Sequence, residues 1–291
     1  MNSIANQVCS NQVFANQAFA NQAFTNQAFL FDLLKLALYT FSAYAALIVY
    51  ARHIKTPWLA RLTTKRFALL TLLTALVVGV KVFEDVVAKE SGPVDAALLW
   101  FIKQVTPPGM VSFFDAVTLT GAAKFLVPAT AVLSILFLVT RHQAQAVLLV
   151  TSMASGWALT YALKSTIGRA RPELWTTAWY WGSSFPSGHT LSTAAFSTAV
   201  VISTAQIWPK SRFVTLPLAV GWVSLMALSR LVLGVHWPTD VLAAICLGVF
   251  IPLAISVLSM VSMASMVVLK DDMQTAPGAI SVNSKIDTLN K

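Results

Sequence analysis

Long apolar segments alternate with short polar segments along most of this chain. A helix of about 20 apolar residues crosses the hydrocarbon core of a bilayer, and the longest of these segments reach or exceed that length. Seven apolar spans follow one another: Leu30–Tyr50, Phe67–Val87, Phe125–Thr140, Ala146–Leu163, His189–Ile207, Val214–Leu228 and Val241–Leu269. The pattern predicts an all-α polytopic membrane helix bundle with about six or seven transmembrane helices.

Two features stand apart from this simple pattern. Ala96–Lys103 is apolar but short, which is typical of an interfacial helix before the third span. Near the end of the second span, Lys81 precedes Glu84 and Asp85 by helical spacings, so these charges are predicted to pair on one helix face. Charges inside a span are also typical of membrane transporters, so a transporter is an alternative function. A transporter would carry charges deep in several spans, whereas the other charges of this chain gather mostly at span ends.

The N-terminal segment is repetitive. Residues 6–30 hold five copies of a pentapeptide that begins with Asn-Gln. These copies supply little more than one coil of a pentapeptide β-helix, which needs several coils to bury a core, so a disordered tail is predicted. The expected organisation is a tail at 1–29, N-terminal transmembrane helices and loops at 30–94, a core at 95–269 and a disordered C-terminal tail at 270–291.

Composition and charge agree with a membrane protein. Hydrophobic residues make up 57% of the chain, charged residues only 11%, and the mean hydropathy is +0.71. The net charge of +9 lies largely in short loops, where basic residues set membrane orientation, so nucleic acid is not expected as a partner. The basic loop Ala51–Arg66 shares a face with Arg141 and with Lys210 and Arg212, and this face is predicted to be cytoplasmic.

Three fragments at span ends hold residues suited to phosphate chemistry. They are Lys164…Arg171-Pro172, Pro186-Ser187-Gly188-His189 and Ser229-Arg230…His236…Asp240. Alternation of the spans brings all three to the face opposite the basic loops. A phosphoryl group in transfer spreads negative charge over three oxygens, so a catalyst needs several fixed cationic donors. Lys164, Arg171 and Arg230 are predicted to supply them.

Ser187 and Gly188 are predicted to complete the phosphate site. They precede a run that is helical from His189 or Thr190 onward, and backbone N–H groups at a helix N-terminus attract anions. Gly188 would let phosphate oxygens approach the main chain closely. Ser187 taken alone is equally typical of an ordinary N-cap.

Two histidines and one carboxylate supply the reactive groups. His236 and Asp240 are four residues apart, so the carboxylate can hold Nδ1–H of the ring and leave the Nε2 lone pair free. His236 is therefore the predicted nucleophile. His189 is the remaining titrating group on this face and the predicted general acid. This scheme requires no metal ion and no cofactor.

These fragments resemble the signature of the type 2 phosphatidic acid phosphatase superfamily. That signature is a Lys, six residues and Arg-Pro; then Pro-Ser-Gly-His; then Ser-Arg, five residues, His, three residues and Asp. The fragments that begin at Lys164, Pro186 and Ser229 fit every defining position. The resemblance spans about residues 95–262 and implies the helical core that this family shares with vanadate-dependent haloperoxidases. The continuous apolar spans favour the membrane lipid-phosphatase branch.

The resemblance implies a metal-independent integral membrane phosphatase that forms a phosphohistidine intermediate on a lipid phosphomonoester or pyrophosphate. Phosphatidic acid, phosphatidylglycerol phosphate and undecaprenyl pyrophosphate are candidate substrates. The expected location is a bacterial inner or plasma membrane, with the site on the periplasmic or extracellular face. The resemblance implies that His236, His189 and Asp240 are catalytic. It also implies that the phosphate is bound by Lys164, Arg171, Ser187, Gly188 and Arg230.

Two points of this resemblance stay open. An inactive member that binds phosphate or lipid is an alternative, although no motif position is substituted. Family members commonly have six spans and a cytoplasmic N-terminus, whereas the pattern of this chain predicts seven spans and an N-terminus outside.

Overall fold

The computed structural model describes residues 27–54, 66–175 and 182–275. The predictions for the pentapeptide tail before residue 27, for most of the basic loop at 55–65 and for the chain beyond Thr275 lie outside the described residues.

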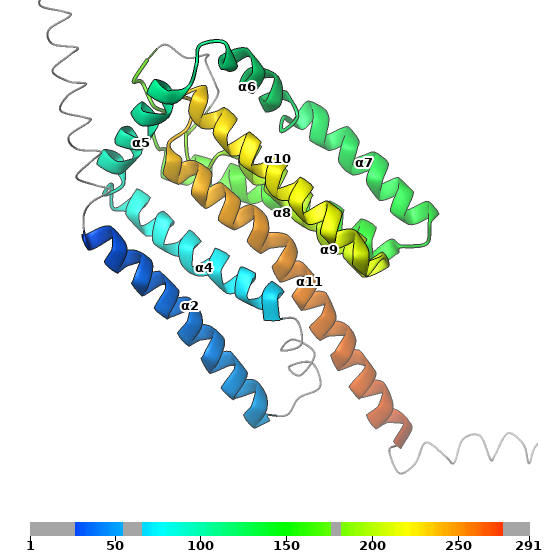
Figure 1. The fold of residues 1–291 in the computed structure, drawn as a ribbon. Coiled ribbons are helices and arrows are strands. Elements are labelled where there is room, and N and C mark those ends of the chain that lie inside the picture. Colours follow the sequence, from blue (N-terminus) through cyan, green and yellow to red (C-terminus); the bar gives the residue numbers. More distant parts are fainter. Residues whose placement is uncertain (1–26, 55–65, 176–181, 276–291) are drawn as a thin grey trace, which may run out of the picture.

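The described residues form nine α-helices and no strand (Figure 1). The helices are α2 Gln27–Ile54, α4 Arg66–Val87, α5 Gly92–Val105, α6 Met110–Leu119, α7 Ala123–Val139, α8 Gln143–Ile167, α9 Gly188–Ile207, α10 Arg212–Val232 and α11 Pro238–Thr275. A single 3-10 turn, Pro209–Ser211, precedes α10. The predicted all-α fold is confirmed, and the short helix expected at Ala96–Lys103 lies within α5.

The described helices give five to six membrane spans. Five segments are long and apolar enough to cross a bilayer: Arg66–Val87, Gln143–Ile167, Gly188–Ile207, Pro209–Val232 and Pro238–Met260. Helices α6 and α7 meet at a bend of 45° and together meet the same criteria. The predicted third span is therefore one arm of a bent pair. Helix α2, Gln27–Ile54, contains the predicted first span Leu30–Tyr50.

Helix α9 is the central helix of the bundle. It packs against α8, α10 and α11 and more lightly against α7 (Figure 1). Small residues allow these helices to approach closely. A Cβ added at Gly248 of α11 would lie 2.6 Å from the Cβ of Ala194 and 2.6 Å from the carbonyl oxygen of Leu191 on α9. A Cβ added at Gly156 of α8 would lie 3.1 Å from the Leu191 side chain.

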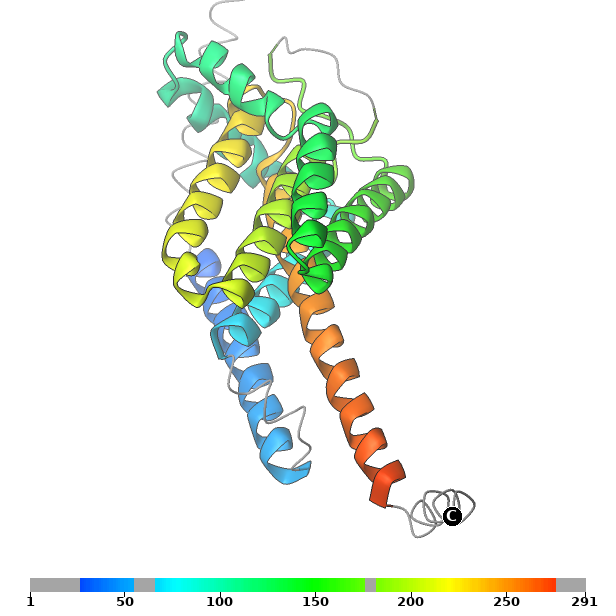
Figure 2. The ribbon, with the colours of Figure 1, turned by 90° about the vertical axis from the view of Figure 1, so that its right-hand side faces the viewer.

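Helices α2, α4 and α11 form the other side of the molecule. Helix α4 packs against α11, and α2 packs against α4. Figure 2 shows α2 and α11 extending beyond α7–α10 at the end away from α5. Helix α11 continues to Thr275, past residue 270, where the sequence analysis places the start of the C-terminal tail. The periodic apolar pattern fades after Leu269, but local helix propensity carries the backbone further.

The charge cluster near the end of α4 pairs as predicted. Nζ of Lys81 lies 2.6 Å from Oδ1 of Asp85 and 3.7 Å from Oε2 of Glu84. All three side chains are partly or largely exposed, which identifies a peripheral ion pair.

Candidate active site

The three predicted fragments meet at one end of the bundle. Lys164 lies in the last turn of α8, His189 in the first turn of α9, Arg230 in the last turn of α10 and Asp240 in the first turn of α11. Successive helices run in opposite directions, so these ends fall on one side. Helix α5 contacts both α10 and α11 at this end (Figures 1 and 2).

Arg171 is fixed beside the ring of His236. Its Nη1 lies 3.3 Å from Nε2 of His236 and donates a hydrogen bond of 2.8 Å to the carbonyl oxygen of Val235. Its Nε donates a 3.2 Å hydrogen bond to the carbonyl oxygen of Gly182. The guanidinium therefore lies next to the nitrogen that the sequence identifies as the candidate nucleophile.

His236 and Asp240 are buried next to each other. Nδ1 of the ring lies 3.6 Å from Oδ2 of the carboxylate, slightly beyond hydrogen-bond distance. Burial lowers the pKa of His236 to about 4; the Asp240 carboxylate opposes this shift, and the Arg230 and Arg171 guanidiniums add to it. The imidazole is consequently neutral at neutral pH, the protonation state that a nitrogen nucleophile requires.

Both oxygens of Asp240 have fixed partners. Oδ1 accepts a 2.6 Å hydrogen bond from Nη1 of Arg169. Oδ2 accepts a 2.9 Å hydrogen bond from the backbone N–H of Trp237 and another from the hydroxyl of Ser184. The carboxylate is therefore held in one orientation, with Oδ2 toward His236.

The other two predicted cations are anchored by neighbouring loops and helices. Nζ of Lys164 donates to the carbonyl oxygen of Ser183, which lies in the segment leading to α9. Arg230 is completely buried and donates from Nη1 to the hydroxyl of Thr118 on α6. The Thr118 hydroxyl lies 3.3 Å from that of Ser229. A buried guanidinium held in this way is poised for an anion.

The start of α9 agrees with the predicted helix N-terminus. Ser187 is the N-cap residue and α9 begins at Gly188. The Ser187 hydroxyl lies 3.0 Å from that of Thr190 and does not cap the helix backbone. A Cβ added at Gly188 would make only an ordinary 3.5 Å contact with Thr160, so packing within the protein does not demand glycine here. Its predicted role toward a phosphate remains a prediction.

His189 shares the environment of the other predicted site residues. The groups that act on it electrostatically are Arg230, His236, Lys164 and Arg171. Lys164 in turn interacts with Arg171, Asp240 and Arg230. The structure thus gathers three cations, two imidazoles and one carboxylate from four helix ends. Such a set can bind a phosphoryl group, attack it from nitrogen and transfer a proton.

Sequence reasoning missed four polar contributors. Arg169 and Ser184 contact Asp240 directly, Thr118 contacts Arg230, and Asp95 of α5 contacts Arg169. One signal for Asp95 was available, because it is the only acidic residue in the apolar segment Gly92–Val105. An isolated carboxylate in such a segment indicates a buried partner.

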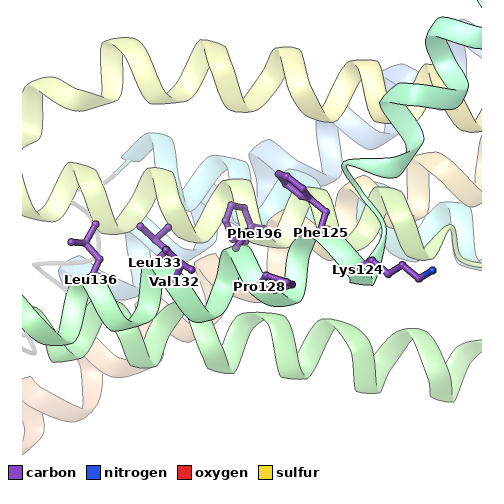
Figure 3. Close-up of a pocket in the computed structure, with 8 residues that line it drawn as sticks. Lys124, Phe125, Pro128, Val132, Leu133, Leu136 and Phe196 are labelled. Carbon is purple, nitrogen blue, oxygen red and sulfur yellow. The ribbon is translucent and has the colours of Figure 1, made fainter.

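Several apolar grooves of the described residues lie outside this polar cluster. One groove of about 210 Å³ runs between α4, α8 and α11 and includes Phe185, the residue before Pro186. Another, of about 450 Å³, lies along α7 and is bordered by Phe196 of α9, with Lys124 at one end (Figure 3). Neither lining includes a predicted site residue, but Phe185 of the first groove is two residues from Ser187.

Among the residues that the structure describes, no three His, Cys, Asp or Glu side chains are grouped so as to hold a metal ion. That the reaction needs no cofactor stays a prediction.

Part of the core matches a known protein family. Residues 145–264 match the model of the PAP2 superfamily. The phosphatidylglycerophosphatase B of Escherichia coli (strain K12) is 36% identical over 63 residues, which are 22% of this chain and 24% of that protein. The phosphatidylglycerophosphatase B of Bacillus subtilis (strain 168) is 26% identical over 150 residues, which are 50% of this chain and 74% of that protein.

A solved structure has the same fold. The crystal structure of a transmembrane PAP2-type phosphatidylglycerolphosphate phosphatase from Bacillus subtilis aligns with a TM-score of 0.56 and 23% sequence identity. The alignment covers 64% of this chain and 96% of that one. At this identity the match concerns the fold. The alignment with the Escherichia coli relative spans about a quarter of that protein's length.

Proposed function

We propose that this chain, whose residues 145–264 match the PAP2 superfamily model, is an integral membrane phosphatase that removes a terminal phosphate from an amphiphilic phosphomonoester or pyrophosphate. The reaction would use His236 as nucleophile, Asp240 as its support and His189 as general acid. Lys164, Arg171, Ser187, Gly188 and Arg230 would hold the phosphate.

The two sides of the His236 ring carry this proposal. Nε2 lies 3.3 Å from the Arg171 guanidinium, and Nδ1 lies 3.6 Å from the Asp240 carboxylate. A phosphate bound by Arg171 would therefore have its phosphorus near Nε2, while Asp240 would stabilise the positive charge that develops on the ring.

The proposed reaction has two steps. Nε2 of His236 attacks phosphorus, an N–P bond forms, the P–O bond to the lipid breaks, and His189 gives its proton to the leaving oxygen. Water then attacks the phosphohistidine while His189 takes a proton from it. The N–P bond breaks, phosphate leaves, and both histidines return to their starting states.

A lipid substrate is supported by the apolar groove beside the cluster. This groove is lined by side chains of α4, α8 and α11 and by Phe185, two residues before Ser187. A hydrocarbon chain can lie in such a groove while its phosphate reaches the polar residues at the helix ends. Phosphatidylglycerol phosphate is the first substrate to test, because two relatives are named phosphatidylglycerophosphatase B.

The distribution of basic residues supports an orientation. Arg141 follows α7, Lys210 lies in the 3-10 turn before α10, and Arg212 is the first residue of α10, all at the end of the bundle away from the polar cluster. Basic loops favour the cytoplasmic side. We therefore place the site on the periplasmic or extracellular face of a bacterial inner or plasma membrane.

The test is phosphate release by the detergent-purified protein in the presence of EDTA. Phosphatidylglycerol phosphate, phosphatidic acid, undecaprenyl pyrophosphate and a soluble phosphomonoester would be compared, each beside His236→Ala. Release that is lost in the variant supports metal-independent histidine catalysis and ranks the substrates. Absence of release, combined with binding of orthovanadate, would instead favour an inactive phosphate-binding protein.

A further inference from the structure

We propose that Asp95 and Arg169 are positioning residues that set the orientation and charge of Asp240, and through it the reactivity of His236. The inference rests on the proposed phosphatase function and extends the site to α5, which lies before the matched residues 145–264.

Arg169 bridges two carboxylates. Its Nη1 lies 2.6 Å from Oδ1 of Asp240, and its Nη2 lies 2.6 Å from Oδ2 of Asp95. Both carboxylates are completely buried, and the Arg169 side chain is 15% exposed. Further contacts fix the guanidinium: Nη2 donates a 3.0 Å hydrogen bond to Ser91, and the group stacks over the ring of Trp237 at 5.7 Å.

Asp95 also holds the start of the helix that carries Asp240. Its Oδ1 accepts a 2.9 Å hydrogen bond from the backbone N–H of Thr239, and its Oδ2 accepts a 2.6 Å hydrogen bond from the Thr239 hydroxyl. Thr239 and Asp240 are neighbours in the first turn of α11. One carboxylate of α5 therefore fixes both the guanidinium that pairs with Asp240 and the backbone next to it.

The charge balance of this triad favours attack by His236. Two carboxylates share one guanidinium, so one net negative charge remains beside the ring. Negative charge next to the imidazole stabilises the cationic ring that forms when Nε2 bonds to phosphorus. Without the Asp95 carboxylate, the whole charge of Arg169 would act on Asp240 and the remaining negative charge would be neutralised.

The side chains of Asp95 and Arg169 contact Ser91, Trp237, Thr239 and Asp240. The partners of Lys164 and Arg230 are Ser183 and Thr118, on other segments. Loss of Asp95 should therefore act on turnover and leave phosphate binding in place. A purely structural role would change both together or lower only stability.

The experiment compares steady-state phosphate release by the wild type, Asp95→Asn and Asp85→Asn in detergent. Asp85→Asn is the control, because it removes a carboxylate from an ion pair of the same 2.6 Å length whose partner, Lys81, is not a predicted site residue. We expect Asp95→Asn to lower kcat about 10- to 100-fold, with KM and the inhibition constant of inorganic phosphate within about threefold of the wild type. The control should retain the wild-type kcat.

Loss of one partner of a buried ion pair is destabilising, so Asp95→Asn can fail to fold. In that case Arg169→Lys provides the test. Lysine retains the charge but cannot donate to both carboxylates in the fixed geometry of arginine, so kcat should again fall at nearly constant KM. An unchanged kcat in a folded Asp95→Asn or Arg169→Lys protein would overturn this inference alone. No release by the wild type would overturn the proposed function as well.

Discussion

Nη1 of Arg171 lies 3.3 Å from Nε2 of His236, although the two residues are separated by 65 positions in the chain. The contact joins the loop that follows α8 to the loop between α10 and α11. It brings a cation suited to a phosphate oxygen next to a nitrogen suited to attack phosphorus.

Replacing His236 by alanine removes the proposed nucleophile. We expect kcat to fall by at least about 1000-fold, since no other described imidazole lies beside both Arg171 and Asp240. The measurement is phosphate release by purified protein. His142→Ala is the control, because His142 lies before α8 at the opposite end of the bundle and should keep full activity. Retained turnover in His236→Ala would remove the nucleophile assignment.

Replacing Arg171 by alanine removes a cationic hydrogen-bond donor to the bound phosphate but leaves the proposed nucleophile in place. We expect KM and the dissociation constant of orthovanadate to rise at least about tenfold, which corresponds to the loss of one charge-assisted hydrogen bond. Arg141→Ala removes an arginine at the other end of the bundle and should change neither quantity. Equal vanadate affinity in Arg171→Ala and the wild type would contradict the binding role.

In the pH profile of kcat/KM, the loss of activity on the acid side should occur at an unusually low pH. Burial lowers the pKa of His236 from 6.5 to about 4, so the neutral ring persists as pH falls and is lost only near pH 4. Activity should therefore survive below pH 6.5, once the ionisation of the substrate is allowed for. In Asp240→Asn, loss of the carboxylate that raises this pKa should move the limb to lower pH. A limb at 6.5 in both proteins would indicate a solvated ring.

Replacing Gly248 by alanine should destabilise the bundle. The added Cβ would lie 2.6 Å from both the Ala194 side chain and a backbone carbonyl oxygen of α9, so the two helices must move apart. We expect a loss of about 1–3 kcal/mol, seen as a lower Tm in detergent. Gly221→Ala on α10 meets no atom within 4 Å and serves as the control. Equal Tm values for the two variants would argue against close packing of α9 and α11.

Much of the helical architecture was predictable because the bilayer imposes a local rule. A span needs enough consecutive apolar residues, and this requirement is visible in segments such as Phe67–Val87 without knowledge of any neighbour. The bend between α6 and α7 was not predictable, because the apolar pattern continues on both sides of the break at Thr120 to Ala122. The extension of α11 past Leu269 was missed for the opposite reason, because the apolar pattern ends there while the helix continues.

The candidate site divides in the same way. The amino-acid sequence alone determined which residues could handle a phosphate, because their types and spacings, such as His236 and Asp240 four apart, encode that chemistry locally. Only the tertiary structure decided that Arg169 pairs with Asp95 and Asp240, 74 and 71 positions away. Ion pairs between distant segments depend on how whole helices pack, and no local pattern records which buried charges will meet.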